Sequence, residues 1–383
     1  MSTKAKIIAA VAVIGVILAG WLYMEFGDGV STLAHVDAEI TIPYEFDSGA
    51  TFYSYNSSEF FFCTKDGVKF MNTAGEQQWE EVISLTNPVL YGKCDTIALI
   101  EAKGRKAYVF NTLGKLYERR FDAPVLSFSV SQTGHLAVIL QSSDGYCVEV
   151  HSPGSMEAVW RYVISSPNIY PLSADVSPDG RVAALSLLDL NPDAYHSMKT
   201  NIVFMYTSQA DAASTTDADG KFAGETLSDQ IALVRFMNNK LLAVSDKNIT
   251  CYTVSENVKQ DWQIALENEL EQFETFGNDG FVIVAGGSDG SKRPEDSSAG
   301  MLEFYNIKGK RTGGYQTSGV DYISMSINSV IVGKNRNYEA INNRGKLLWS
   351  YTASQDIRQL MFLGYENTAL ASGATNAWIM RKD

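Results

Sequence analysis

A hairpin unit that recurs about every 40 residues is the feature that most constrains this chain, because such periods are typical of stacked repeats. Each copy has an apolar strand that often ends in Asn, a turn that usually contains Gly, and in most cases a second strand with a large aromatic residue. The copies occupy residues 70–79, 109–117, 148–160, 202–206, 250–262, 304–309 and 340–349, of which 202–206 is the most degenerate.

A second hairpin type lies between the copies of the first. It is clearest at residues 173–185 (SADVSPDGRVAAL), where Pro-Asp-Gly supplies a tight turn between two apolar strands. Residues 128–138 repeat it, and weaker versions begin near Ala50, Val89, Ile231, Phe273, Tyr322 and Leu360. Two hairpins per repeat make a four-stranded blade, so the sequence predicts an all-β, eight-bladed β-propeller over residues 36–383. A seven-bladed ring and an open β-solenoid are the alternatives.

The last repeat is incomplete, since the chain ends on a single strand at residues 377–380. Residues 38–43 (AEITIP) precede the first repeat and have the composition of a strand. We expect this segment to pair as the outermost strand of the last blade, because ring closure removes exposed sheet edges. Only residues 261–274 have a mildly helix-like pattern after the N-terminal region.

The N-terminal region contains an uncharged apolar run at residues 7–24 (IIAAVAVIGVILAGWLYM), which is just long enough for a membrane-spanning helix. Two lysines precede the run and two acidic residues follow it, and basic residues favour the cytoplasmic side. The sequence therefore predicts a cytoplasmic segment at 1–6, a transmembrane helix at 7–24, a linker at 25–35 and an extracytoplasmic propeller. A cleaved signal peptide is the alternative, although the run is longer than a usual signal core.

The formal net charge of −13 limits the partners of the chain. An acidic domain is repelled by nucleic acid and by anionic lipid headgroups, so we expect no nucleic-acid partner. The acidity is typical of a solvated surface, and a site for a basic partner is the alternative.

Residues with catalytic or ligand chemistry are sparse. The cysteines, Cys63, Cys94, Cys147 and Cys251, match no zinc or redox spacing, so we expect buried thiols, with one disulfide as the alternative. The histidines, His35, His135, His151 and His196, are scattered, and we expect His135 and His151 to be exposed. The sequence therefore predicts no catalytic, cofactor-binding or metal-binding residues. We expect Trp79, Trp160, Trp262 and Trp349 to pack neighbouring blades together.

Two polar insertions interrupt the repeats, at residues 208–230 and 288–300. Insertions in a repeat fold form loops, and binding residues concentrate in loops, so these segments are the predicted interaction sites. Residues 217–222 (DADGKF) resemble part of a calcium-binding loop, but Thr215 and Thr226 stand where the first and last ligands belong. A solvated acidic loop is the favoured interpretation.

The VSPDGRVAAL unit and the Asn-Thr-x-Gly hairpins resemble the WD40-like and pyrroloquinoline-quinone-like repeats of β-propellers. The quinone-dependent enzymes of that superfamily need an adjacent cysteine pair, which is missing here, so the resemblance implies the fold without the cofactor. One N-terminal anchor followed by a degenerate propeller also resembles a bacterial domain-of-unknown-function family typical of Gram-positive organisms. That resemblance implies an extracytoplasmic location.

These features together favour a non-catalytic scaffold, anchored in the cell membrane, that presents loops to another envelope protein or a wall polymer. The alternative is an extracytoplasmic enzyme of the hydrolase or lyase type with a carboxylate site in the propeller funnel. An enzyme should gather several carboxylates, or a His with carboxylates, at one mouth of the channel, whereas a scaffold should not.

Overall fold

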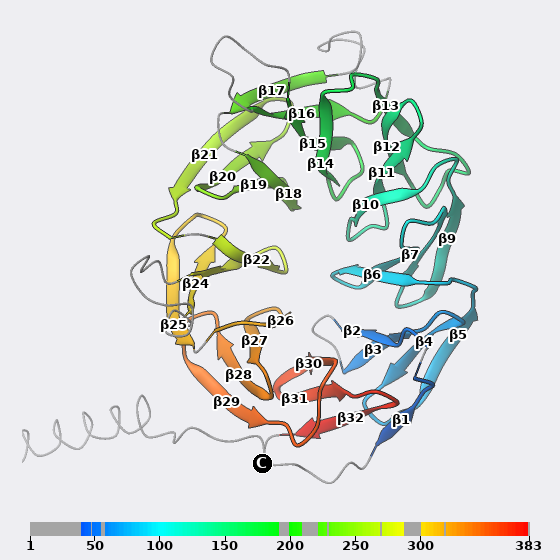
Figure 1. Ribbon diagram of the computed structural model, residues 1–383, viewed down its shortest axis with the longest axis vertical. Coiled ribbons are helices and arrows are strands. Elements are labelled where there is room, and N and C mark those ends of the chain that lie inside the picture. The colour runs from blue at the N-terminus through cyan, green and yellow to red at the C-terminus, as the bar shows by residue number, and fades with distance from the viewer. Residues whose placement is uncertain are drawn as a thin grey trace, which may run out of the picture.

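A ring of eight antiparallel sheets, each with four strands, makes up the computed structural model (Figure 1). The structure describes residues 40–381 except 47, 55–57, 191–198, 209–220, 228–229, 269, 287–299 and 318. The predicted all-β, eight-bladed propeller is confirmed, and the seven-bladed and solenoid alternatives are wrong.

Each of the first seven blades is a meander in which four consecutive strands run from the channel to the rim. The strands of blades 1 to 4 are β2 (Thr51–Tyr53), β3 (Glu59–Cys63), β4 (Gly67–Asn72), β5 (Gln77–Val82), β6 (Pro88–Lys93), β7 (Thr96–Glu101), β8 (Lys106–Asn111), β9 (Gly114–Arg120), β10 (Val125–Val130), β11 (Leu136–Ser142), β12 (Gly145–His151), β13 (Trp160–Ile164), β14 (Ile169–Val176), β15 (Val182–Asp189), β16 (Lys199–Tyr206) and β17 (Lys221–Leu227). Those of blades 5 to 7 are β18 (Ile231–Met237), β19 (Lys240–Ser245), β20 (Asn248–Val254), β21 (Val258–Ala265), β22 (Leu270–Phe276), β23 (Gly280–Ala285), β24 (Gly300–Asn306), β25 (Arg311–Thr317), β26 (Tyr322–Met325), β27 (Ser329–Lys334), β28 (Asn337–Asn342) and β29 (Leu347–Thr352).

Blade 8 joins the two ends of the described chain. It contains β30 (Gln359–Leu363), β31 (Tyr365–Ser372), β32 (Asn376–Arg381) and, outermost, β1 (Thr41–Pro43). Thr41 pairs with Trp378 and Pro43 pairs with Asn376 in an antiparallel register. This pairing is the ring closure expected from the unpaired last strand, although residues 38 and 39 of the predicted strand lie outside the described residues.

The recurring Asn-x-x-Gly sequence forms the turn between the third and fourth strands of several blades. The Asn72 side-chain oxygen accepts hydrogen bonds from the backbone amides of Ala74 (2.9 Å) and Glu76 (3.0 Å). Gly75 has a φ of +78°, which favours glycine because a side chain is strained there. Asn306 and Asn342 make the same pairs of bonds, so the motif recurs because the turn requires it.

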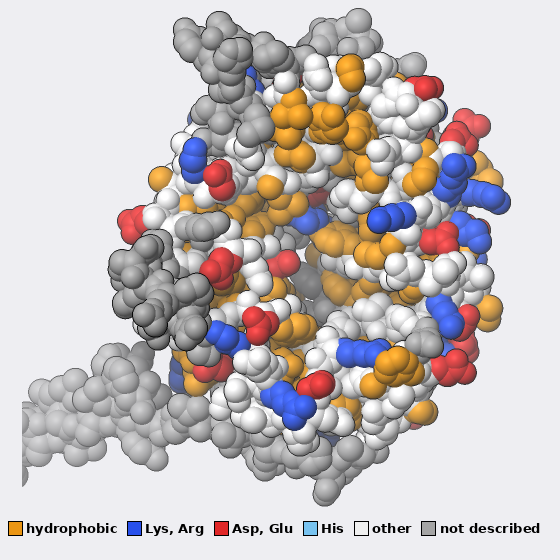
Figure 2. Space-filling view, viewed as in Figure 1, with side chains coloured by type: hydrophobic (Ala, Val, Ile, Leu, Met, Phe, Trp, Pro, Cys, Tyr) orange, Lys and Arg blue, Asp and Glu red, His pale blue; other side chains and the backbone are white. Residues whose placement is uncertain are grey.

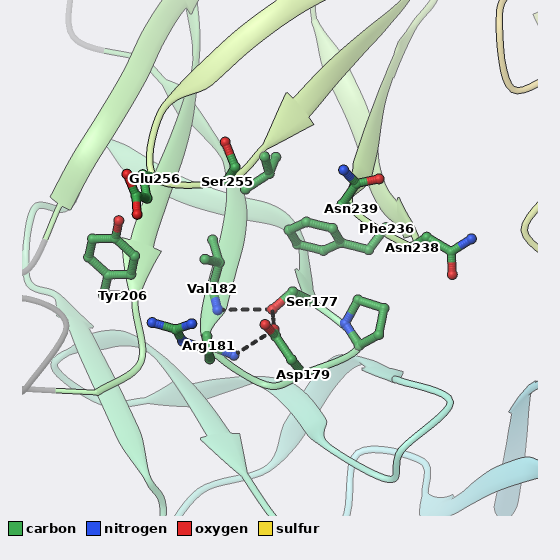
Figure 3. Close-up of a pocket in the computed structure, with 12 residues that line it drawn as sticks. Ser177, Asp179, Arg181, Val182, Tyr206, Phe236, Asn238, Asn239, Ser255 and Glu256 are labelled. Atoms are coloured by element: carbon green, nitrogen blue, oxygen red, sulfur yellow. Dashed lines mark hydrogen bonds between the residues drawn. The ribbon is translucent and has the colours of Figure 1, made fainter.

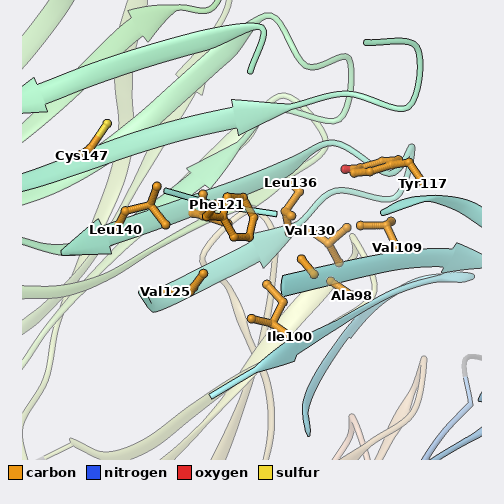
Figure 4. Close-up of a cluster of buried hydrophobic side chains, with 12 residues drawn as sticks. Ala98, Ile100, Val109, Tyr117, Phe121, Val125, Val130, Leu136, Leu140 and Cys147 are labelled. Carbon is orange, nitrogen blue, oxygen red and sulfur yellow. The ribbon is translucent and has the colours of Figure 1, made fainter. Parts of the chain in front are cut away.

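The core consists of apolar clusters between adjacent blades, and Figure 4 shows the cluster that blades 2 and 3 share. Aromatic residues extend this packing toward the rim. Trp79 of blade 1 stacks on Phe110 of blade 2, with ring centroids 6.0 Å apart, and its indole nitrogen donates to the Thr112 carbonyl at 2.8 Å. Trp349 and Trp262 donate to the next blade in the same way.

The structure differs from the sequence pattern in three segments. The helix-like tract at 261–274 lies largely in β21 and β22, because its apolar positions face the neighbouring blades as strand residues. The insertion predicted at 208–230 contains β17, which completes blade 4. The insertion predicted at 288–300 ends in Gly300, the first residue of β24. The other residues predicted at 209–220 and 288–299, including most of the calcium-like segment, lie outside the described residues.

The described residues include no helix with the length and hydropathy that crossing a membrane requires. The predicted segments at 1–6, 7–24 and 25–35 lie outside the described residues.

The ring has two faces, which we name by their loops. The lower face carries the loops between the first and second and between the third and fourth strands of each blade, and the upper face carries the others. Neighbouring lower-face loops bond directly: the Asn343 amide donates to the Asn328 carbonyl at 2.8 Å, and the Ile307 amide donates to the Asp279 carbonyl at 2.9 Å.

Candidate functional site

A central funnel and a groove between two blades are the main hollows that the described residues line. The funnel encloses about 380 Å³, and its wall comes from β2, β6, β22, β26 and β30 or the residues that directly follow them. Figure 2 shows the central opening, with basic and acidic side chains at its wall.

An ion pair closes one side of the funnel. The Lys93 ammonium group lies 3.7 Å from the Asp175 carboxylate and donates to the Phe236 carbonyl at 2.8 Å. Asp175 also accepts from the Ser129 hydroxyl at 2.8 Å and from the Phe236 amide at 2.7 Å. Desolvation lowers the pKa of Lys93 below the ordinary lysine value, and Asp175 opposes part of this effect. Since the Asp175 side chain is fully buried, the pair ties four blades together and its carboxylate is not available to a ligand.

A second polar contact crosses the funnel next to this pair. The Arg235 guanidinium of blade 5 donates to the Tyr91 hydroxyl of blade 2 and lies 4.7 Å from the centre of its ring. Burial raises the pKa of Tyr91 to about 12, although Arg235 opposes the rise. Tyr91 therefore stays protonated at physiological pH and acts as a neutral hydrogen-bonding group.

Glu274 is the carboxylate that the funnel presents to its interior. The Glu274 side chain is exposed to water in the funnel, but the protein atoms that line the funnel partly desolvate its carboxyl group and so raise its pKa. Arg235 opposes part of the rise. A carboxyl group with a raised pKa can act as a general acid, so Glu274 is the residue on which the enzyme alternative depends.

The groove lies on the lower face between blades 4 and 5 and encloses about 500 Å³. Its apolar residues are Pro178, Val182, Phe236 and Val254. Figure 3 shows Arg181, Tyr206 and Glu256 toward one end and Asn238 and Asn239 toward the other.

The floor of the groove is rigid because the Pro-Asp-Gly turn of blade 4 forms part of it. The Ser177 hydroxyl donates to the Asp179 carboxylate at 2.6 Å and accepts from the Val182 amide at 3.0 Å. The Asp179 carboxylate also accepts from the Arg181 amide at 3.1 Å. Gly180 has a φ of +75°, which its missing side chain allows. The same turn that identified the repeat therefore fixes one wall of the groove.

The cysteines and His151 differ in how far they match the sequence-based predictions. None of the four cysteines, all of which the structure describes, forms a disulfide, and Cys63, Cys147 and Cys251 are buried, so the disulfide alternative is wrong. His151 is buried, not exposed as predicted, because it packs edge-on against Phe121 and its Nε2 lies 3.0 Å from the Glu149 carboxylate. Among the residues that the structure describes, no three His, Cys, Asp or Glu side chains are close enough to hold a metal ion.

Sequence reasoning missed the charged residues of the funnel. Lys93, Asp175, Arg235 and Glu274 each lie in the innermost strand of a different blade, far apart in the sequence. One signal was present: Asp175 interrupts the apolar strand of the clearest repeat unit, and an ionised residue in a buried strand needs a partner.

The fold and its hollows define an eight-bladed β-propeller with a closed ring, a bridged funnel and an inter-blade groove. The chain belongs to the family of unknown function DUF5711, which matches residues 33–378. No curated protein matches the sequence significantly.

Several solved structures are similar to the chain. BamB from Moraxella catarrhalis is 12% identical, with 91% of this chain and 100% of that chain covered and a TM-score of 0.49. Hsv2p from Kluyveromyces lactis is 9% identical, with 82% and 98% covered and a TM-score of 0.45. The β-propeller domain of Cps50 (Swd1) from Myceliophteria thermophila is 12% identical, with 90% and 99% covered and a TM-score of 0.45.

Proposed function

We propose that the chain is a non-catalytic interaction scaffold of the bacterial envelope, of the Gram-positive type, that docks a segment of another envelope protein in the groove between blades 4 and 5. The observation that carries this proposal is the groove itself, which joins an apolar floor to a rim of hydrogen-bonding side chains. Apolar anchors surrounded by polar groups are the usual pattern of protein recognition.

The chemistry of the groove indicates the kind of segment that it accepts. A volume of about 500 Å³ is large enough for two or three side chains of a partner. The partly exposed side chains of Pro178 and Tyr206 offer contact to an apolar side chain over the buried Phe236 and Val254. The exposed amide of Asn239 and hydroxyl of Ser255 offer bonds to a peptide backbone. We therefore propose an extended peptide segment with one apolar anchor as the ligand.

The proposal includes the membrane anchor at 7–24, with the propeller on the extracytoplasmic side. The length and lack of charge of this run support a helix that is retained in the membrane. The lysines before it support a cytoplasmic N-terminus.

The enzyme alternative has one specific observation in its favour, the raised pKa of Glu274 in the funnel. Glycoside hydrolysis and similar reactions usually need a second carboxylate a few ångströms away. The carboxylate beside the funnel, Asp175, does not line it: Asp175 is fully buried and bonded to three other blades. This arrangement supports the scaffold over the hydrolase.

Site-specific photo-crosslinking in native membranes tests the scaffold. A photoreactive phenylalanine replaces Ser255, which is exposed in the groove, or, as a control, Ser143, which is exposed on the upper face of blade 3. We expect a discrete, protease-sensitive adduct from position 255 alone, and we expect Asn239→Trp, which fills the groove, to abolish it. An adduct that survives Asn239→Trp, or that forms equally at both positions, contradicts docking in the groove. An adduct removed only by wall-hydrolysing enzymes identifies a wall polymer in place of a protein.

A further inference from the structure

The N-terminal segment of the chain enters the ring on the lower face, between blades 8 and 1. Strand β32 ends on this face at Arg381, and the antiparallel β1 therefore begins there. Ile40 lies against the lower-face turn of blade 1, since a Cβ atom on Gly75 would be only 2.8 Å from the Ile40 side chain. The proposed anchor thus reaches the ring through residues 25–39, and the lower face is the one to which it leads.

This connection alone does not orient the propeller. A chain of this length spans about 50 Å when it is fully extended, which is enough to let the ring face the bilayer in many ways. The orientation of the ring relative to the bilayer must therefore be set by contacts between the ring surface and the membrane.

The lower face of blades 6 to 8 carries a cluster of exposed basic residues, which we name the lower basic cluster: Lys308, Lys310, Arg311, Arg344, Lys346 and Arg381. Blades 6 and 7 are in direct contact here, because the Thr312 hydroxyl at the start of β25 donates to the Asn343 carbonyl in the loop of blade 7 at 2.7 Å. Three acidic residues lie in the same region. They are Glu303, which pairs with Arg311 at 3.2 Å, Glu366, which accepts from Ser329, and Asp279. The cluster keeps a positive excess in a chain whose net charge is −13.

We propose that the lower basic cluster binds anionic lipid headgroups of the membrane in which the chain is anchored. The proposal rests on the membrane anchor of the proposed function. It commits to the lipid surface because the connection to the anchor and the cluster lie on the same face, in adjacent blades.

The overall acidity does not oppose this contact. Charges more than about 10 Å apart are largely screened at an ionic strength of 0.1 M. A six-residue strand is about 20 Å long, so the acidic residues of the upper face lie beyond this distance from the headgroups. This part of the surface is therefore an exception to the expected repulsion between the acidic domain and anionic lipid. Each basic residue near such a surface strengthens binding about fivefold.

The contact also determines what the ring presents to other molecules. Blades 4 and 5 lie on the opposite side of the ring from blades 8 and 1 (Figure 1). A ring that rests on blades 6 to 8 tilts, so that blade 3, which is opposite blade 7, stands farthest from the bilayer. The groove between blades 4 and 5 lies between the contact and this raised side, although it opens on the lower face.

Energy transfer to labelled lipid in nanodiscs tests the proposal on the full chain. Two donor positions, Ala74→Cys in the lower-face turn of blade 1 and Ser143→Cys on the upper face, are compared in a Cys94→Ser background. The discs contain either phosphatidylcholine with a third of phosphatidylglycerol or phosphatidylcholine alone. We expect transfer to be at least about twofold more efficient from position 74 than from 143 in the anionic discs, and this ratio to fall toward one in the neutral discs.

Charge reversal distinguishes the contribution of the lower basic cluster to the membrane contact from that of the connection to the anchor. The variant Lys308→Glu, Lys310→Glu, Arg344→Glu should lose the twofold ratio in anionic discs. The matched control, Lys103→Glu, Arg105→Glu, Lys247→Glu, makes the same charge change in upper-face loops and should keep it. Equal transfer from positions 74 and 143 in anionic discs overturns the proposal, as does a ratio that persists in neutral discs or in the lower-face variant. A chain that does not enter the discs overturns both this proposal and the anchor, whereas failure of the Ser255 crosslink leaves this contact intact.

Discussion

Individual buried charges hold the centre of the ring together. Lys93 and Asp175 come from blades 2 and 4, and both bond to Phe236 of blade 5, one through its carbonyl and the other through its amide. A buried ion pair is a weak source of stability as a whole, but removal of one partner leaves an uncompensated charge. The pair therefore fixes how the inner strands meet more than it adds to the free energy of unfolding.

The first prediction concerns this pair. Lys93→Met should lower the free energy of unfolding by about 3 kcal/mol or more, because it leaves the buried Asp175 carboxylate without its cation. Adding Asp175→Asn should recover part of the loss, since the amide is neutral. Urea unfolding of both single variants and the double variant measures the coupling between the residues. Strictly additive losses would show that the two side chains do not interact.

The second prediction concerns the pH dependence that Glu274 contributes. Its pKa is raised in the folded state, so the folded protein holds this proton more tightly than the unfolded chain. Stability from this group is full below the unfolded value of about 4.3 and is lost as the pH rises through the raised folded value. Glu274→Gln should therefore stabilise the protein at pH 7, by up to about 0.5 kcal/mol since water reaches the carboxylate, and should have no such effect below about pH 4. Thermal unfolding at pH 7 and at about pH 4 measures the change in stability. A larger gain at the lower pH would contradict a raised pKa of Glu274 in the folded protein.

At the scale of the strand, β1 has a role out of proportion to its length. Its three residues supply the outer edge of blade 8. Ile42 is 6% exposed and packs in the cluster of Phe52 and Phe62, so β1 ties blade 8 to blade 1 by side chains as well as by the backbone.

The third prediction tests this strand by a matched pair of substitutions. Ile42→Asp buries an unpaired carboxylate and should cost about 3 kcal/mol or more. Leu113→Asp introduces the same group at a lower-face loop where the side chain is 90% exposed, and should change stability by no more than about 0.5 kcal/mol. Deletion of residues 36–46 should be at least as harmful as Ile42→Asp. Equal melting temperatures for the two substituted variants would show that β1 does not close the ring.

The sequence predicts the repeated elements well because two types of turn mark the hairpins along the chain. The Asn-x-x-Gly and Pro-Asp-Gly turns mark their hairpins directly, and the unpaired strand at 377–380 indicates the closure by β1. The sequence of β17, KFAGETL, contains a central Gly and neither Val nor Ile, so the sequence predicts a loop there, and pairing with β16 makes it a strand.

The candidate site was much less predictable from sequence. The groove exists only where loops of blades 4 and 5 meet, and the funnel only where inner strands from different blades converge. The burial of His151 was equally hard to predict from the sequence, since it depends on Phe121 of the neighbouring blade.

At the scale of the whole molecule, the closed ring carries the groove, and the proposed anchor holds the ring at the membrane. The closed ring holds the groove in a fixed shape, while the funnel is bridged by its own charges. A scaffold needs a docking groove of fixed shape and does not need an open funnel.

The fourth prediction concerns the anchor. The full-length chain should stay with the membrane fraction after salt and alkaline carbonate washes and should be released by detergent, because an apolar run of this length binds lipid far more strongly than surface charge does. Fractionation followed by immunoblotting measures it. Release of a shortened chain into the medium would show that residues 7–24 are cleaved as a signal peptide.

The most direct test of the scaffold is the affinity of the crosslinked partner for three forms of the chain: unmodified, Asn239→Trp and Glu274→Gln. Asn239→Trp fills the groove and should raise Kd at least about tenfold, a change of about 1.4 kcal/mol, while Glu274→Gln should leave it within about twofold. Unchanged binding by Asn239→Trp together with lost binding by Glu274→Gln would contradict the scaffold and place the functional site in the funnel.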